Sequence, residues 1–400
     1  LYLVFELVVS IMNGTPPPVP SKSLVKHWNL GIGPILSHAF NHDNTLLAVS
    51  SAEKVFVFAF EGGNWKQIHE LPQHDFSVTG LDWAAETNRL VSCSHDKNSF
   101  VWTVGSNSTF KPELVLLRSQ HGLSCVKWSP RENKFAVGTH ARHLSVCYYE
   151  KENDWWVAKQ IKKSIDSTIL CIDWHPNNVM VVAGTTDFRV LVFSTYIKEV
   201  CKKFCYIRLI RFRKVDDKPA PNPWGSKLPF GILLAEFVTC GWVHSVAFSP
   251  SGNQLAWSTR GSEINIVNKT NGAEAQPVTI QHKFLPFTSL LWIDETSFVG
   301  IGHEYSPILF DVVDGKAVFR KKIGAPAVEK ENMQSSAFKM FRNIDRTAAT
   351  QDTNDSRPNS LHQNAVKTLK RYATNPKGVT KFSTSGLDGV IAVWDLKGSA

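Results

Sequence analysis

The stretch SVTGLDWAAETNRLVSCSHDKNSFVWT at residues 77–103 contains the pattern that decides the fold of this chain. Short apolar runs alternate with turn residues in it, as expected for consecutive antiparallel strands. The same pattern returns at residues 122–149 and 168–194. A central tryptophan marks each copy, at spacings of 45 and 46 residues: Trp83, Trp128 and Trp174. The chain is therefore built from a repeated β unit.

Four further copies bring the number of units to seven. They are more or less divergent and lie at residues 35–59, 242–268, 287–311 and 379–395. A repeat of this period with four strands per unit predicts an all-β, seven-bladed β-propeller of the WD type. We assign residues 23–400 to this single domain. Because only five residues follow Asp395, we expect a strand near residues 23–30 to complete the seventh blade and close the ring.

Two sets of polar residues recur at fixed places in the repeat. In such blades a His, a turn Asp, a Ser or Thr and a strand Trp form a buried hydrogen-bonded set. The candidates are His74, Ser92, Asp96 and Trp102 in the second unit, and His362, Thr384, Asp388 and Trp394 in the seventh. A His, an Asp and a Ser could also form a hydrolytic triad. Since each member recurs with the repeat and satisfies a turn, we interpret both sets as structural.

The chain is longer than seven units require. At about 42 residues each, the units leave a surplus, which we place at residues 196–240 and 325–365. Loops of this length in a compact domain are usually functional or disordered. The second surplus region contains SSAFKMFRNIDRTA at residues 335–348, which is typical of an amphipathic helix. We therefore predict a helix-containing insertion at residues 328–360, between the sixth and seventh blades.

The predicted helix has an apolar face and a basic face. Its apolar face would contain Ala337, Met340, Phe341 and Ile344, with Phe338 at the margin. Its basic face would contain Lys339, Arg342 and Arg346. The apolar face could pack on its own propeller or serve as an exposed anchor for a partner groove. Spacing alone favours packing on the propeller, because apolar stripes of helices more often face a core.

The positive charge of the chain is concentrated in one block. The net charge is +9 at pH 7, and residues 201–215 contain six basic residues and no acidic ones. The remainder is nearly balanced, and no nucleic-acid motif accompanies the block, so we predict no nucleic-acid partner. We treat residues 201–215 as an atypical basic insertion.

The cysteines and the N-terminal residues carry little structural information. Seven cysteines without a C-x-x-C pair fit neither a disulfide framework nor a zinc ribbon, so we expect free thiols in a reducing compartment. Residues 1–22 form an unassigned leader that we expect to be disordered or non-native. Its apolar run is too short to span a bilayer.

No pattern in the sequence predicts catalysis. The chain offers no metal-ligand cluster, no phosphate loop and no paired acids outside the turn positions. We therefore predict that the protein is not an enzyme, binds no metal and needs no cofactor.

Several longer stretches resemble one family of WD-repeat proteins. They are TNRLVSCSHDKNSFVWT, CVKWSPRENKFAVGTHARHLSVCYYEKENDWWVAKQIKK, DWHPNNV and PWGSKLPFG. They resemble subunit 1 of the actin-related protein 2/3 complex, from about residue 27 to the end of the chain. The segment around Trp155 and Trp156 and the run at residues 223–227 are the most specific matches. Residues 201–215 and the leader lie outside the resemblance.

The resemblance implies a non-catalytic structural subunit that supports nucleation and branching of actin filaments. The implied partners are the other subunits, including two actin-related proteins, the mother filament and nucleation-promoting factors. The implied location is the cytoplasm and the actin cytoskeleton, with the nucleus as a further site. An unrelated WD scaffold or adaptor, such as a ubiquitin-ligase substrate receptor or a coat subunit, is the alternative.

The resemblance also assigns a role to the predicted helix. In that family a helix between the sixth and seventh blades protrudes and meets actin at the branch. It implies an actin-binding and partner-binding set formed by Phe338, Met340, Phe341, Arg342, Ile344 and Arg346. Phe338, Phe341 and Ile344 would be apolar anchors, and the arginines would complement an acidic surface.

Overall fold

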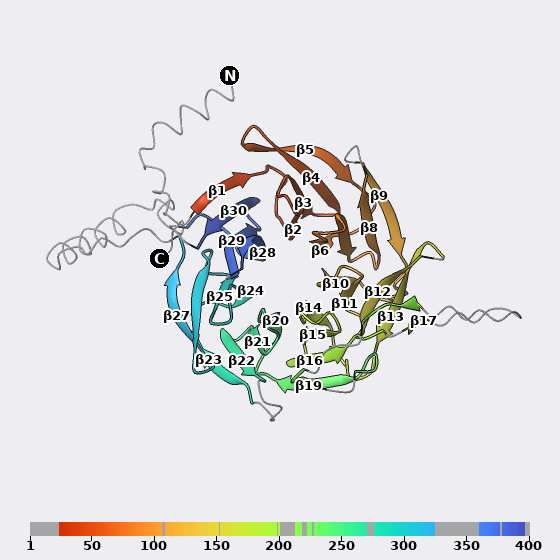
Figure 1. Cartoon of the computed structure of the whole chain (residues 1–400). Coiled ribbons are helices and arrows are strands. Elements are labelled where there is room, and N and C mark those ends of the chain that lie inside the picture. The colour runs from red at the N-terminus through yellow and green to blue at the C-terminus, as the bar shows by residue number, and fades with distance from the viewer. Residues whose placement is uncertain are drawn as a thin grey trace, which may run out of the picture.

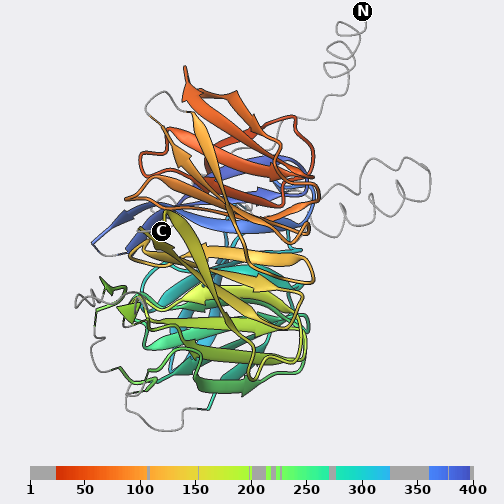
Figure 2. The ribbon, with the colours of Figure 1, turned by 90° about the vertical axis from the view of Figure 1, so that its right-hand side faces the viewer.

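Seven four-stranded antiparallel sheets stand around a central axis as the blades of a β-propeller (Figure 1). The side view shows strands that cross from one face of the disc to the other (Figure 2). The computed structural model describes residues 24–105, 109–151, 153–197, 199–200, 213–217, 222–225, 228–269, 276–324, 360–376 and 378–396. The fold class predicted from the repeats, an all-β seven-bladed propeller, is confirmed. The helix predicted within residues 328–360 lies outside the described residues.

The first four blades follow the order of the chain. The first contains β2 (Ser37–Phe40), β3 (Leu46–Ser51), β4 (Lys54–Glu61) and β5 (Asn64–Leu71). The second contains β6 (Val78–Trp83), β7 (Arg89–Ser94), β8 (Ser99–Val104) and β9 (Phe110–Val115). The third contains β10 (Leu123–Trp128), β11 (Lys134–Thr139), β12 (Leu144–Glu150) and β13 (Trp155–Ile161). The fourth contains β14 (Ile169–Trp174), β15 (Met180–Thr185), β16 (Arg189–Ser194) and β19 (Leu233–Val238).

The last three blades complete the ring. The fifth contains β20 (Val243–Phe248), β21 (Gln254–Thr259), β22 (Glu263–Asn268) and β23 (Val278–Gln281). The sixth contains β24 (Phe287–Trp292), β25 (Ser297–Gly302), β26 (Ile308–Val313) and β27 (Lys316–Lys322). The seventh contains β28 (Val366–Asn375), β29 (Gly378–Gly386), β30 (Val390–Asp395) and β1 (Leu24–Asn29).

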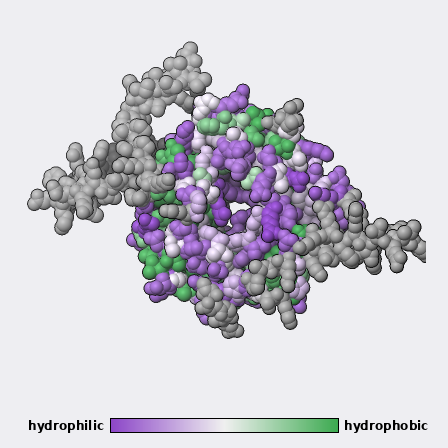
Figure 3. All heavy atoms as spheres, viewed as in Figure 1, coloured by the Kyte–Doolittle hydropathy of each residue, from purple (hydrophilic) through white to green (hydrophobic). Residues whose placement is uncertain are grey.

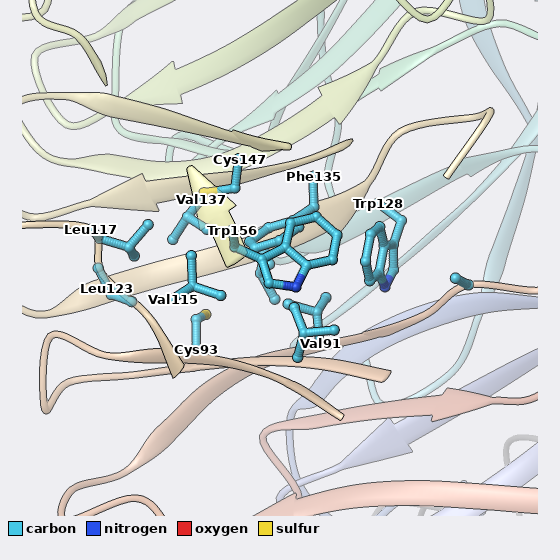
Figure 4. Close-up of a cluster of buried hydrophobic side chains, with 13 residues drawn as sticks. Val91, Cys93, Val115, Leu117, Leu123, Trp128, Phe135, Val137, Cys147 and Trp156 are labelled. Carbon is cyan, nitrogen blue, oxygen red and sulfur yellow. The ribbon is translucent and has the colours of Figure 1, made fainter. Parts of the chain in front are cut away.

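Each blade buries its apolar side chains against the next blade. In the cluster of Figure 4, Val91 and Val115 of the second blade face aromatic residues of the third. The ring of Trp156 lies 5.6 Å from that of Trp128 and 5.1 Å from that of Phe135, measured between centroids. Because a four-stranded sheet has two faces, a blade loses water from both only when it has a neighbour on each side.

The ring is closed by the N-terminal strand. β1 pairs antiparallel with β30, and Trp28 lies opposite Ile391 in the register. The outer strand of the seventh blade therefore comes from the opposite end of the chain. In addition, Trp28 makes edge contacts with Phe60 and Trp65 of the first blade, at centroid distances of 6.0 and 5.9 Å. The closing strand thus contacts both the seventh and the first blades.

A buried histidine joins the first blade to the seventh near the axis. Nδ1 of His38 lies 2.7 Å from the hydroxyl oxygens of both Thr368 and Ser385, and Nε2 lies 2.8 Å from that of Ser383. Burial lowers the pKa of His38 to about 3, and the neighbouring Lys370 and His362 lower it further. The imidazole is therefore neutral in the folded protein at pH values where a free histidine is charged.

The surplus region between the fourth and fifth units has two parts. The sequence analysis placed the whole of residues 196–240 outside the propeller, and this is wrong for residues 233–238, which form β19, the outer strand of the fourth blade. Its pattern of Leu, Ala, Glu and Phe is short and lacks the tryptophan that marks other strands. This outer strand was missed because a long insertion, and not a short turn, separates it from β16.

The two ends of the basic insertion lie side by side. β17 (Glu199–Val200) pairs with β18 (Arg213–Lys214) in a separate two-stranded sheet that adds nothing to the blade. Just outside this pair, the amide of Ile197 donates to the carboxylate of Asp216 at 2.9 Å, and the amide of Asp216 donates to the carbonyl of Ile197 at 3.0 Å. The Asp216 carboxylate also forms a buried ion pair with Lys134 of the third blade. The propeller therefore holds both ends of the basic insertion together.

We predict that His38 makes the stability of the propeller depend on pH. Because its pKa is lower in the folded than in the unfolded protein, its stabilising contribution is complete above about pH 6.5 and is lost as the pH falls toward 3. In His38→Gln, the free energy of unfolding should depend less on pH. Between pH 6.5 and 5, it should fall by up to about 1.4 kcal/mol less per pH unit than in the parent protein. Urea unfolding across this range measures the slope. Equal slopes in the two proteins would contradict the assignment.

Candidate functional site

The predicted polar set of the second blade is assembled in the structure. The indole N–H of Trp102 donates to the hydroxyl oxygen of Ser92 at 3.0 Å, and Nε2 of His74 lies 2.8 Å from the same oxygen. Nδ1 of His74 lies 2.7 Å from a carboxylate oxygen of Asp96. Because a carboxylate only accepts, Nδ1 carries the proton, and in the neutral ring Nε2 accepts from the Ser92 hydroxyl.

This arrangement suits a structural role and not a hydrolytic one. Ser92 is fully buried and its oxygen is already bound by an indole, so no substrate carbonyl can reach it. Burial alone would raise the pKa of Asp96, but hydrogen bonds from His74 and from the Asn98 and Asp75 amides outweigh it and hold the pKa below its usual range. The carboxylate stays ionised and ties the turn between β7 and β8 to the loop before β6.

The predicted set of the seventh blade has the same geometry. Nε2 of His362 lies 2.9 Å from the hydroxyl oxygen of Thr384, which also accepts from the indole of Trp394 at 2.9 Å. Nδ1 of His362 lies 3.1 Å from a carboxylate oxygen of Asp388. Burial raises the pKa of Asp388, but the hydrogen bonds from His362 and from two backbone amides outweigh it and lower the pKa overall. Threonine takes the place that serine has in the second blade.

The seventh-blade set also supports the base of the second insertion. The described chain stops at Gly324 and resumes at Ser360, two residues before His362. Gly324 has a φ of +82° and packs so closely on Trp394 that a Cβ atom there would lie 2.7 Å from the indole ring. On the other side, the hydroxyl of Ser360 donates to the carbonyl of His362 at 2.7 Å. Both ends of the insertion are therefore fixed to the hydrogen-bonded core of the seventh blade.

The residues predicted to contact actin or a partner lie outside the described residues. They are Phe338, Met340, Phe341, Arg342, Ile344 and Arg346. The structure gives the place from which this segment departs, the face formed by the loops that connect successive blades. Sequence reasoning missed that Gly324 is needed there, because its contact with Trp394 spans seventy positions of the chain.

The two tryptophans of the family-specific segment have different surroundings. Trp156 is buried in the core between the second and third blades. Its neighbour Trp155 is 57% exposed at the start of β13, where the side chain points away from that core. Alternation along a strand predicts this difference, and a large exposed aromatic residue is a common anchor in protein interfaces.

The surface of the disc offers broad contact areas. Hydrophilic residues surround the central opening, while apolar residues gather near the periphery (Figure 3). At the outer edge of the sixth blade, Val313, Val318 and Phe319 are each more than two-fifths exposed. Within the described ranges, no group of His, Cys, Asp and Glu could hold a metal ion, and no helix is long and apolar enough to cross a membrane.

Comparison with known proteins gives a family. The chain is 42% identical over 369 residues to actin-related protein 2/3 complex subunit 1A-B of Xenopus laevis, covering 91% of this chain and 94% of that protein. It is 39% identical over 384 residues to subunit 1 of Schizosaccharomyces pombe, covering 91% and 97%. The chain belongs to the family of subunit 1 of the actin-related protein 2/3 complex. The plant member, subunit 1B of Arabidopsis thaliana, is 34% identical over 374 residues.

The family model for the WD domain, G-beta repeat, matches residues 65–103 and 159–194. Each match begins in the outer strand of one blade and continues through the three inner strands of the next. In this chain, the unit that repeats in sequence is thus shifted by one strand from the unit that folds as a blade. The outer strand of each blade therefore belongs to the sequence repeat that follows. No repeat follows the seventh blade, so β1 supplies its outer strand.

We predict that the base of the insertion tolerates no side chain at Gly324. Gly324→Ala should lower the free energy of unfolding by about 1 to 2 kcal/mol through its left-handed backbone, and by about 1 to 3 kcal/mol more through the clash with Trp394. Gly315→Ala is the control, because Gly315 has a φ of +73° but open space around its Cα. Urea unfolding compares the two variants. Equal losses would show that the contact with Trp394 does not constrain the insertion.

Proposed function

We propose that this chain is a non-catalytic structural subunit of an actin-related protein 2/3 complex. In this role it supports nucleation and branching of actin filaments through contacts with the other subunits, two actin-related proteins among them, and with the mother filament. Nucleation-promoting factors are a further class of partner. The observation that carries the proposal is the similarity to subunit 1 proteins over 91% of the chain. The proposed location is the cytoplasm and the actin cytoskeleton, with the nucleus as a further site.

The described geometry supports a structural role. The ring is closed, and its blades share continuous apolar cores, so the loops of both faces are held in fixed positions. The arrangement of Ser92, His74 and Asp96, which resembles a catalytic triad, is buried and satisfied. A protein of this kind acts by presenting surfaces, which is what a subunit of a large assembly requires.

We assign the contact with actin to the segment at residues 335–348. The support for this is its apolar face and its arginines in the sequence, together with the fixed base formed by Gly324 and Ser360. Three buried apolar side chains would contribute about 1.5 to 3 kcal/mol each, comparable with the cost of association of about 4 to 15 kcal/mol. The segment would therefore bind weakly alone and act as one contact among several in a multivalent assembly.

The alternative named in the sequence analysis, an unrelated WD adaptor, does not fit the similarity to subunit 1 proteins over 91% of the chain. It would share the propeller but would not purify with two actin-related proteins. Affinity purification of the tagged chain followed by mass spectrometry separates the two: recovery of a stable set of subunits including both actin-related proteins supports the first.

We predict that Phe338→Ala combined with Phe341→Ala leaves assembly of the complex intact and reduces branching. Removal of both rings takes away most of the apolar area of the proposed anchor, so branch density in a pyrene-actin and microscopy assay should fall at least severalfold. Phe319→Ala is the matched control, since Phe319 is 44% exposed on the outer edge of the sixth blade just before the insertion. Normal branching by the double variant would contradict the assignment of the actin contact.

A further inference from the structure

The turns between the second and third strands of the blades follow one rule. Each has a residue in the left-handed region: Ala52, Lys97, Arg142, Phe188, Ser262, Tyr305 and Gly389. The residue just before it is acidic in four blades: Asp96, Asp187, Glu304 and Asp388. In the third blade this residue is Ala141, and the turn reads Thr-His-Ala-Arg-His with no acid. The third blade therefore has a basic turn where four others have a carboxylate.

In the second and seventh blades the carboxylate has the same backbone partner. Asp96 accepts a hydrogen bond from the amide of Asp75 at 3.2 Å, and Asp388 accepts one from the amide of Gln363 at 2.9 Å. Asp75 and Gln363 each lie three residues before the innermost strand of their blade. In the third blade this place belongs to Gln120. With Ala141 opposite, the Gln120 amide lacks the acceptor that its two counterparts have.

A cavity of about 430 Å³ lies at this position. Its lining includes Gln120, His121, His140, Ala141, Arg142 and Asp166. The one acid in the lining, Asp166, is paired with Arg189 at 2.7 Å. Among the described residues, Arg142 has no carboxylate partner, so its charge is uncompensated. The lining is thus rich in hydrogen-bond donors and poor in available acceptors.

His140 of the cavity, together with His95 beside it outside the lining, indicates the same imbalance. The rings of His140 and His95 lie 5.4 Å apart between centroids. Burial lowers the pKa of His140, and the neighbouring His95 and His121 lower it further. A cluster of imidazoles that repel one another's protons is a place where an anion would be stabilising.

We propose that this cavity binds a phosphate group, which takes the place that the Asp96 carboxylate occupies in the second blade. The Gln120 amide, the Arg142 guanidinium and the imidazoles of His121 and His140 supply more donors than the two oxygens of one carboxylate would use. A phosphate has three terminal oxygens and up to two negative charges, and arginine binds it in a forked geometry. The ligand is inorganic phosphate or the phosphate of a modified side chain.

The test is a titration of the full chain, labelled with [¹⁵N]glutamine, by inorganic phosphate at constant ionic strength. The amide signal of Gln120 should shift and saturate, because a new acceptor reaches it. The signal of Gln363 should not move, since Asp388 already occupies the same place in its blade. A shift of Gln120 that rises linearly without saturation, or that equals the shift of Gln363, would overturn the proposal.

Three variants sharpen the test. Ala141→Asp restores the carboxylate found in other blades and should abolish the response of Gln120, while an unchanged Gln363 signal reports that the chain is folded. Arg142→Ala should weaken phosphate binding by about tenfold or more through loss of a charged hydrogen bond. Lys97→Ala removes a cation from the same turn position of the second blade and should leave the affinity unchanged. Binding by Ala141→Asp equal to that of the parent would contradict the site.

A second titration identifies the source of the phosphate. The probe is the peptide acetyl-Ala-phosphoserine-Ala-amide, with the unphosphorylated peptide as its control. Tighter binding of the phosphopeptide than of inorganic phosphate supports a modified side chain as the ligand. Equal or weaker binding supports free phosphate. A response to the unphosphorylated peptide equal to that of the phosphopeptide would exclude recognition of the phosphate group.

Discussion

The pairing of β1 with β30 is the interaction on which the rest of the structure depends. Each blade has two apolar faces and can exclude water from both only when it lies between two others. A ring with one gap would expose two such faces and the edge of a sheet. The shift between sequence repeat and blade creates this gap in the seventh blade, and the N-terminal strand fills it. Two further contacts join the seventh blade to the first. His38 bonds Ser383 near the axis, and Trp28 packs against Phe60 at the periphery.

Closure also explains how this β protein can hold a long insertion. The insertion leaves the end of the sixth blade and returns at the start of the seventh, and both of its ends contact the seventh blade, where Gly324 rests on Trp394 and His362 is bonded to Asp388 and Thr384. The set that stabilises the turn thus stabilises the base of a segment proposed to contact actin. The basic insertion is held in a comparable way by Asp216. In both places the blade is complete without the inserted residues.

The repeat made much of this fold predictable. The tryptophan spacing and the turn aspartates indicated seven blades, and the polar sets of the second and seventh units were found because their members recur at fixed offsets. Other features depend on contacts between distant residues, which a local pattern does not contain. The outer strand β19 was missed because an insertion separates it from its blade. The absence of an acid at Ala141 is recognised only when the turns of the blades are compared with one another. The buried ion pair of Lys134 and Asp216 joins the third blade to the end of the basic insertion, which is distant in sequence.

Native-state hydrogen exchange of the full chain tests the closure of the ring most directly. The amides of β1 that bond to β30 should exchange only through global unfolding, with the same free energy as amides of the inner strand β21, because opening the ring exposes two blades. The protection of both strands should fall in parallel as urea is added. Exchange of the β1 amides by a separate local opening, at a much lower free energy while β21 stays protected, would contradict the account.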